Sequence, residues 1–246
     1  MWTFLAMLLG ITLFVGVFAR RLFLTVVGLN KTEPEAVEAD DDFEEDDKIR
    51  LKKGQRQEVN TLFEEAEKKI NRGEEEEAIK IFVKILSIDP LHEASKERLA
   101  LLYLQREAFS SAATLFESLA KLNDSPIHYS HWGIALYQQG DYENAKSAYI
   151  EALKLDNSRA QRYASLSQIY RALGQNYNAM VALNKAIEVQ QENGGDIIPF
   201  WFLVADLQLE MGLVEASKST LEGILIIDAD NEEAKHMLSE ISSKEV

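Results

Sequence analysis

The sequence contains no cysteine among its 246 residues. This absence excludes disulfide frameworks, thiol catalysis and cysteine-ligated zinc or iron–sulfur centres. Only 4 prolines and 12 glycines interrupt the chain, so little in it opposes helices. Positive charge is also scarce, because 26 Lys and Arg face 41 Asp and Glu and leave a net charge of −15. An acidic chain has no general attraction for nucleic acid, and we predict no nucleic-acid partner.

The usual signatures of catalysis are missing as well. The sequence has no glycine-rich phosphate loop, nucleophile elbow or zinc motif. His128 and His131 lie three residues apart on one predicted helix, a spacing that can hold a metal ion, but no third ligand is evident nearby. We therefore predict a protein that is not an enzyme, with no catalytic residue, metal, cofactor or small-molecule substrate.

The N-terminal segment is strongly apolar. Residues 1–19 contain no charged side chain, and a helix of this length spans roughly 28 Å, close to the hydrocarbon thickness of a bilayer. Residues 22–29 (LFLTVVGL) either lengthen a tilted membrane helix or lie along the membrane surface. A cleaved signal peptide is the competing interpretation, but no basic residue precedes the apolar run, and Arg20 and Arg21 directly follow it. We predict a membrane anchor over residues 1–29.

Two charged blocks follow this anchor. Ten of the fifteen residues in 33–47 are acidic, and such a run repels itself and stays extended, so residues 30–47 are predicted to form a disordered acidic linker. Residues 48–58 hold a basic cluster that leads into the first helix. Because Lys and Arg flank the anchor only on its C-terminal side, we predict a single-pass membrane protein with the remaining chain in the cytoplasm.

A pattern of aromatic, small and turn-forming residues recurs along the rest of the chain. Many of its positions return with the same character 34 residues later, and Gly140, for example, is followed by Gly174. Further copies lie on both sides of these two units. Of the two upstream copies, the first ends at Pro90 and the second has Glu107 in place of the turn glycine, and one more copy follows downstream. Small residues at fixed offsets allow two helices to approach closely, while larger ones fill the space between them. Extra residues at 191–195 predict a loop.

This pattern resembles the tetratricopeptide repeat family, and the string Trp132-Gly133…Tyr137…Gly140-Asp141-Tyr142…Ala145 is a specific match. The resemblance covers about residues 59–246. It implies an all-α fold, a right-handed α-α superhelix or solenoid of helix-turn-helix units, to which the sequence adds an N-terminal transmembrane helix. The predicted units are residues 59–92, 93–125, 126–159, 160–197 and 198–231, and a capping helix follows at 232–246.

The resemblance also implies that the function is binding. In this family the first helix of each unit lines a concave groove that holds a peptide or a partner's helix. We therefore predict a membrane-tethered adaptor or scaffold with a protein or peptide partner. The alternative is an envelope assembly or chaperone-like factor whose repeats lie outside the cytoplasm. The predicted groove residues are Asn60, Phe63, Glu67, Glu97, Leu101, Leu104, Ile134, Tyr137, Gln138, Gln168, Arg171, Phe202 and Asp206.

Two details of this groove follow from its residue types. Some family members clamp a partner's terminal carboxylate with Lys, Arg and Asn, but the equivalent positions here hold Phe63, Glu67 and Glu97, so we predict no such clamp. The centre of the groove is apolar, which favours an amphipathic or extended partner segment. For residues such as Leu101 and Tyr137, packing between units is an equally weighted interpretation.

Overall fold

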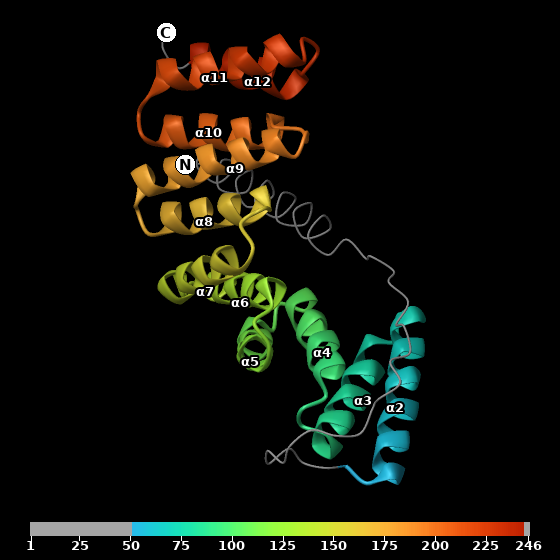
Figure 1. Cartoon of the computed structure of the whole chain (residues 1–246). Coiled ribbons are helices and arrows are strands. Elements are labelled where there is room, and N and C mark those ends of the chain that lie inside the picture. The colour runs from blue at the N-terminus through green and yellow to red at the C-terminus, as the bar shows by residue number, and fades with distance from the viewer. Residues whose placement is uncertain (1–50, 244–246) are drawn as a thin grey trace, which may run out of the picture. The chain divides into compact units, whose positions relative to one another are not determined.

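The computed structural model describes residues 51–243, which form eleven α-helices and no strand (Figure 1). The anchor predicted for residues 1–29 and the linker predicted for residues 30–47 lie outside this range. Within it, no helix combines the length and the apolar character that crossing a membrane requires. The helices are α2 (Lys53–Asn71), α3 (Glu75–Ile88), α4 (Glu93–Gln105), α5 (Phe109–Leu122), α6 (Pro126–Gln138), α7 (Tyr142–Leu155), α8 (Ala160–Ala172), α9 (Asn176–Glu192), α10 (Ile198–Glu210), α11 (Val214–Ile227) and α12 (Glu232–Ser243).

The first ten helices form five antiparallel pairs, each closed by the same tight turn. In the α6–α7 turn, the Gly140 N–H donates to the Tyr137 carbonyl at 3.0 Å and the Asp141 N–H donates to the Leu136 carbonyl at 3.0 Å. This is the Schellman arrangement, which satisfies carbonyls at a helix end and needs a left-handed residue. Gly140 supplies it with a φ of +82°. The equivalent two bonds occur in all five pairs. The same turn geometry therefore joins the two helices of every pair.

The second turn has this geometry without a glycine. Glu107 has a φ of +60°, and its N–H and that of Ala108 make the same two bonds to α4 as in the other turns. Left-handed backbone costs a residue with a Cβ about 1 kcal/mol or more relative to glycine. The hydrogen bonds and the packing of the two helices therefore hold Glu107 in a strained conformation.

We expect Glu107→Gly to raise the free energy of unfolding by about 0.5–1 kcal/mol, because glycine adopts this backbone without the Cβ clash. Urea unfolding followed by circular dichroism measures the change. Glu107→Ala is the matched control and should give no comparable gain, since alanine keeps the Cβ.

Gly140→Val in the α6–α7 turn should have the opposite effect and destabilise the chain, and a neutral result there would contradict the assigned turn.

The second helices of the pairs end at an acidic or amide residue rather than at proline. Asp89, Asp156 and Asp228 each lie just beyond such a helix, and each side chain accepts a backbone N–H two residues further on, at 3.1, 3.0 and 3.3 Å respectively. Pro90 follows the first of these, but Asn157 and Ala229 follow the others. The aspartate turn therefore ends these helices with or without the proline that the family pattern usually has.

The predicted loop at residues 191–195 is only partly correct. Helix α9 continues through Glu192, and its length of 17 residues makes it longer than the other second helices. Gln191 and Glu192 are therefore helical, because no aspartate turn stops α9 where its neighbours end. The Schellman bonds at Gly194 and Gly195 end it instead, with the left-handed residue at Gly194.

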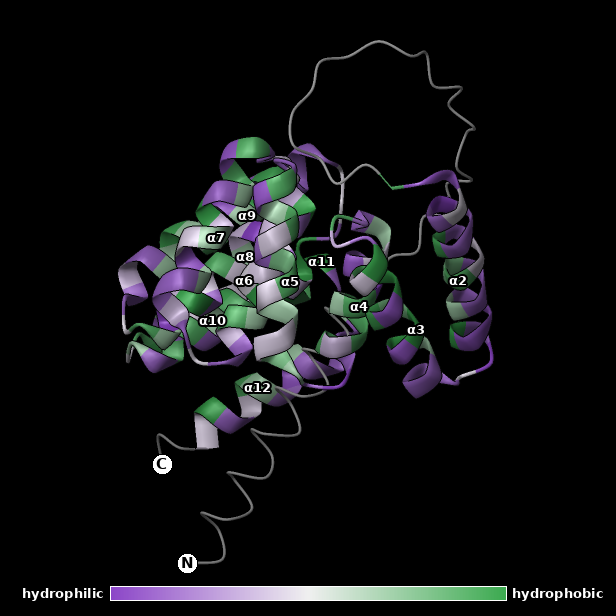
Figure 2. Ribbon diagram, turned by 90° about the horizontal axis from the view of Figure 1, so that it is seen from below, coloured by the Kyte–Doolittle hydropathy of each residue, from purple (hydrophilic) through white to green (hydrophobic). Residues whose placement is uncertain are grey.

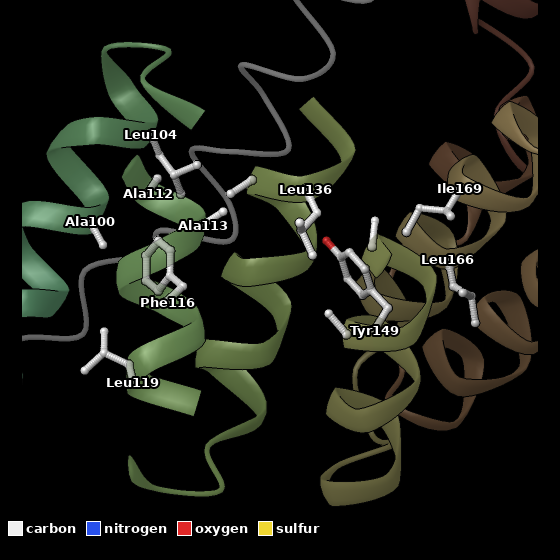
Figure 3. Close-up of a cluster of buried hydrophobic side chains, with 13 residues drawn as sticks. Ala100, Leu104, Ala112, Ala113, Phe116, Leu119, Leu136, Tyr149, Leu166 and Ile169 are labelled. Carbon is white, nitrogen blue, oxygen red and sulfur yellow. The ribbon is translucent and has the colours of Figure 1, made fainter. Parts of the chain in front are cut away.

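Small residues allow the paired helices to approach closely, as the sequence predicted. A Cβ added at Gly133 in α6 would lie 2.6 Å from the ring of Tyr149 in α7, so the ring occupies the space that a side chain would need. Tyr149 belongs to a buried hydrophobic cluster that includes Phe116, Leu136 and Ile169 (Figure 3). Figure 2 shows hydrophobic and hydrophilic residues on the same helices, as in α2.

A buried arginine connects α8 with the preceding pair. Arg162 is 5% exposed, and its guanidinium donates to the Ser130 hydroxyl at 3.1 Å and to the Asp156 carboxylate at 2.6 Å. The Asp156 carboxylate also accepts from Ser158. These hydrogen bonds, with Arg162 first, hold the pKa of the Asp156 carboxyl well below its usual range. The network satisfies the buried charge, and it fixes the end of α7 against α8.

Candidate partner-binding face

All thirteen predicted groove residues lie on the first helices of the five pairs, α2, α4, α6, α8 and α10. We call the surface that these helices share the first-helix face. Its residues differ in exposure: Asn60 and Gln138 are exposed, while most of the others are partly buried. Partner binding by these residues remains a prediction, and the contacts described below show which of them have side chains available for it.

Ion pairs connect first helices of neighbouring pairs. Glu67 in α2 lies 3.0 Å from the Arg98 guanidinium in α4. Further along, Arg171 in α8 donates two hydrogen bonds to the Glu210 carboxylate in α10, one of them 3.0 Å from Nε to Oε2. Both pairs are partly exposed, so each contributes little to stability. Their relevance is geometric, because they show that these side chains meet on one surface.

The centre of the first-helix face is apolar. Leu101, Ile134 and Tyr137 are partly buried and pack against the central hydrophobic cluster. The Tyr137 ring lies 5.4 Å from the ring of Tyr142. Burial and Tyr142 raise the pKa of the Tyr137 hydroxyl, and the Arg171 guanidinium lowers it. These side chains thus pack between units and keep part of their surface in solvent.

One predicted groove residue is wrong. Leu104 is only 5% exposed and lies in the buried cluster with Phe116 and Leu136. It is close to the end of α4, where the helix turns into the Glu107 loop and the side chain is enclosed by α5. So little of its surface is exposed that Leu104 is a core residue rather than a groove residue. Phe63 is partly enclosed too, with its ring 5.8 Å from Phe82 and 5.5 Å from His92.

The C-terminal part of the face is acidic. Burial raises the pKa of the Asp206 carboxyl in α10, Glu210 and Glu233 raise it further, and the Arg171 guanidinium lowers it. Asp206 therefore lies within electrostatic reach of α8, its own helix and α12. Across residues 51–243, no hydrogen bond or ion pair to the Asp206 carboxylate is present.

Two residues of this face, and one residue of α12 beside it, were not identified from the sequence. Ile127 is 47% exposed, and it precedes Ile134 by seven residues, which places both on the same side of α6. Glu210 occupies the repeat position of Gln138, a signal that could have identified it. Glu233 belongs to the helix predicted as a cap, and only its proximity to Asp206 places it here.

The paired histidines lie in different surroundings. His128 is hydrogen-bonded to the Asn123 side chain at 2.8 Å. His131 is 6% exposed, its ring lies 4.9 Å from that of Phe116, and neither ring nitrogen has a hydrogen-bond partner. Burial lowers its pKa to about 4. In the described part of the chain, no group of three or more His, Cys, Asp or Glu is arranged to hold a metal ion.

Comparison with known proteins identifies the repeats. Two models of the tetratricopeptide repeat match, one over residues 129–159 and the other over residues 160–193. The TPR repeat-containing protein MJ1428 of Methanocaldococcus jannaschii is 27% identical over 115 residues, covering 47% of this chain and 20% of that protein. The tetratricopeptide repeat protein 36 homolog of Nematostella vectensis is 35% identical over 66 residues, covering 27% and 36% respectively. The chain thus spans about a fifth and about a third of these relatives.

Solved structures share the helical arrangement. A crystal structure of MamA aligns with a TM-score of 0.64 at 19% identity, covering 71% of this chain and 94% of that one. The structure of MamA 41-end from Desulfovibrio magneticus RS-1 aligns with a TM-score of 0.63 at 14% identity, covering 71% and 97%. At these identities the likeness shows the fold alone, an α-solenoid. The two repeat models identify tetratricopeptide repeats at residues 129–193, and this match supports the family resemblance seen in the sequence.

Proposed function

We propose that this chain is a membrane-tethered adaptor whose first-helix face binds a segment of another protein. The observation that supports the proposal is direct contact between neighbouring first helices, because ion pairs join α2 to α4 and α8 to α10. Surfaces of stacked repeats are suited to holding extended or helical partner segments. The right-handed superhelix implied by the family would make this face the concave one.

The tether is the second part of the proposal, and it depends on the sequence of residues 1–47. An apolar run of anchor length is followed by basic residues and then by an acidic stretch. The anchor would hold the protein at the membrane, and the acidic stretch would give the repeats reach. With the basic flank on the cytoplasmic side, the repeats are in the cytoplasm and carry out no catalysis themselves.

Proximity labelling from a tag placed after Val246 tests this function in cells. The control is the same protein without residues 1–31. Cytoplasmic or membrane neighbours that are lost with the anchor would support the adaptor and identify its partner. Labelling of exported proteins would place the repeats on the other side of the membrane and favour the assembly or chaperone-like alternative. Identical labelling with and without residues 1–31 would contradict the tether.

We expect Tyr137→Ala combined with Phe202→Ala to weaken capture of the labelled partner by about tenfold or more, because aromatic side chains dominate many interfaces. Helix content should change little, since both side chains are only partly buried. Pull-down and circular dichroism measure the two quantities. Tyr177→Ala is the control, because Tyr177 is 78% exposed on the second helix α9. A collapse of thermal stability in the double variant would show that these residues serve packing only.

A further inference from the structure

The first-helix face has more negative than positive charge at its C-terminal part. Arg171 supplies positive charge there, and two of its nitrogens already donate to Glu210. Asp206 and Glu233 add two further carboxylates, which interact unfavourably with each other. Since Asp206 is partly buried, bulk water screens these charges less than it would screen fully exposed ones. A cation at this position would offset the repulsion.

Apolar surface lies next to this charge. Phe202 precedes Asp206 by four residues on α10, so their side chains are neighbours on one side of the helix. On α6, Ile127 is 47% exposed, and Ile134 and Tyr137 are partly exposed. Tyr137 and Arg171 occupy the same repeat position, 34 residues apart, on the successive first helices α6 and α8, which connects the apolar and the acidic parts. A ligand that covers both needs apolar side chains followed by positive charge.

We propose that the segment bound by the first-helix face is amphipathic and basic, with a Lys or Arg against Asp206 and apolar side chains against Tyr137 and Phe202. This inference rests on the proposed function and specifies its partner. Charge complementarity favours it over an acidic segment or a terminal carboxylate, both of which would meet Asp206, Glu210 and Glu233. The net charge of −15 also favours the approach of basic segments and repels acidic ones.

Selection from a phage-displayed library of random 16-residue peptides on the full chain tests the inference. Parallel selections use Asp206→Asn, Asp206→Lys and the control Glu222→Lys, which changes an exposed carboxylate on the second helix α11. We expect Lys or Arg enrichment with the wild-type chain, loss of it with Asp206→Asn, and Asp or Glu enrichment with Asp206→Lys. Glu222→Lys should keep the wild-type preference.

Affinity measurements then separate charge from contact. A selected peptide whose Lys is replaced by Gln should bind the wild-type chain roughly five- to tenfold more weakly, and the two peptides should bind Asp206→Asn about equally. Circular dichroism checks that both Asp206 variants keep their helices. Selected peptides without basic preference, or with basic preference unchanged in both variants, would overturn the inference and leave the binding function intact. Failure to select any peptide would instead contradict the proposed function of the face.

Discussion

Phe116→Ala is expected to lower the free energy of unfolding by about 3–5 kcal/mol, the range for truncating a fully enclosed phenylalanine. Phe116 is 0% exposed and lies in the cluster that joins α4, α5, α6, α7 and α8 (Figure 3). Alanine would remove its contacts and leave a cavity, because close-packed helices relax only partly around a lost side chain. Urea unfolding followed by circular dichroism measures the loss.

Tyr177→Ala is the control for this truncation, because it removes a similar aromatic group from a position that is 78% exposed. It should change the unfolding free energy by no more than about 0.5 kcal/mol. Hydrogen exchange adds a local measurement: amides of α5 and α6 should lose protection in Phe116→Ala more than those of α11 do. A loss below about 1 kcal/mol would mean that the ring does not occupy a close-packed core.

The second large effect is a loss of stability in mild acid that depends on His131. Burial lowers the pKa of this imidazole from 6.5 to about 4, so the unfolded chain binds a proton at a pH where the folded chain does not. Stability therefore falls as the pH falls from about 6.5 to about 4. At about 1.4 kcal/mol per pKa unit, the total contribution is on the order of 3–4 kcal/mol.

His131→Phe should remove this contribution and flatten the dependence of unfolding free energy on pH between about 6.5 and 4. His236→Gln is the control, because His236 is exposed on α12 and the variant should keep the wild-type slope. Asp156 acts in a separate window: its lowered pKa gives stability that is present above pH 3.8 and lost below it. Equal slopes for His131→Phe and the wild-type chain would contradict the assignment.

The helical pairs could be predicted from the sequence because their signals are local. Gly140 and Gly174 identified two turns directly, and their spacing placed the other pairs. At Glu107 the repeat spacing was sufficient to predict the turn without a glycine, since packing imposes the left-handed conformation on a residue that disfavours it. The end of α9 was harder to predict, because the family pattern gives no rule for where an insertion continues a helix and where it forms a loop.

The candidate face was less predictable because side-chain burial depends on neighbouring helices. Helical spacing placed Leu104 beside Leu101, but α5 encloses the former and leaves part of the latter in solvent. Spacing also cannot show that Glu233 of α12 lies near Asp206 of α10. In the same way, His131 appeared as one of a possible metal pair, whereas packing against Phe116 makes it a neutral core residue.

The order in which helices contact each other has a kinetic consequence. Among residues 51–243, every extensive helix–helix contact joins two helices that are consecutive in the chain. No long loop has to close before the first contact between two helices can form. The entropic part of the folding barrier is therefore small. Folding can begin at any pair and extend to its neighbours. While the chain is being synthesised, the pair α2–α3 can form before α12 has been made.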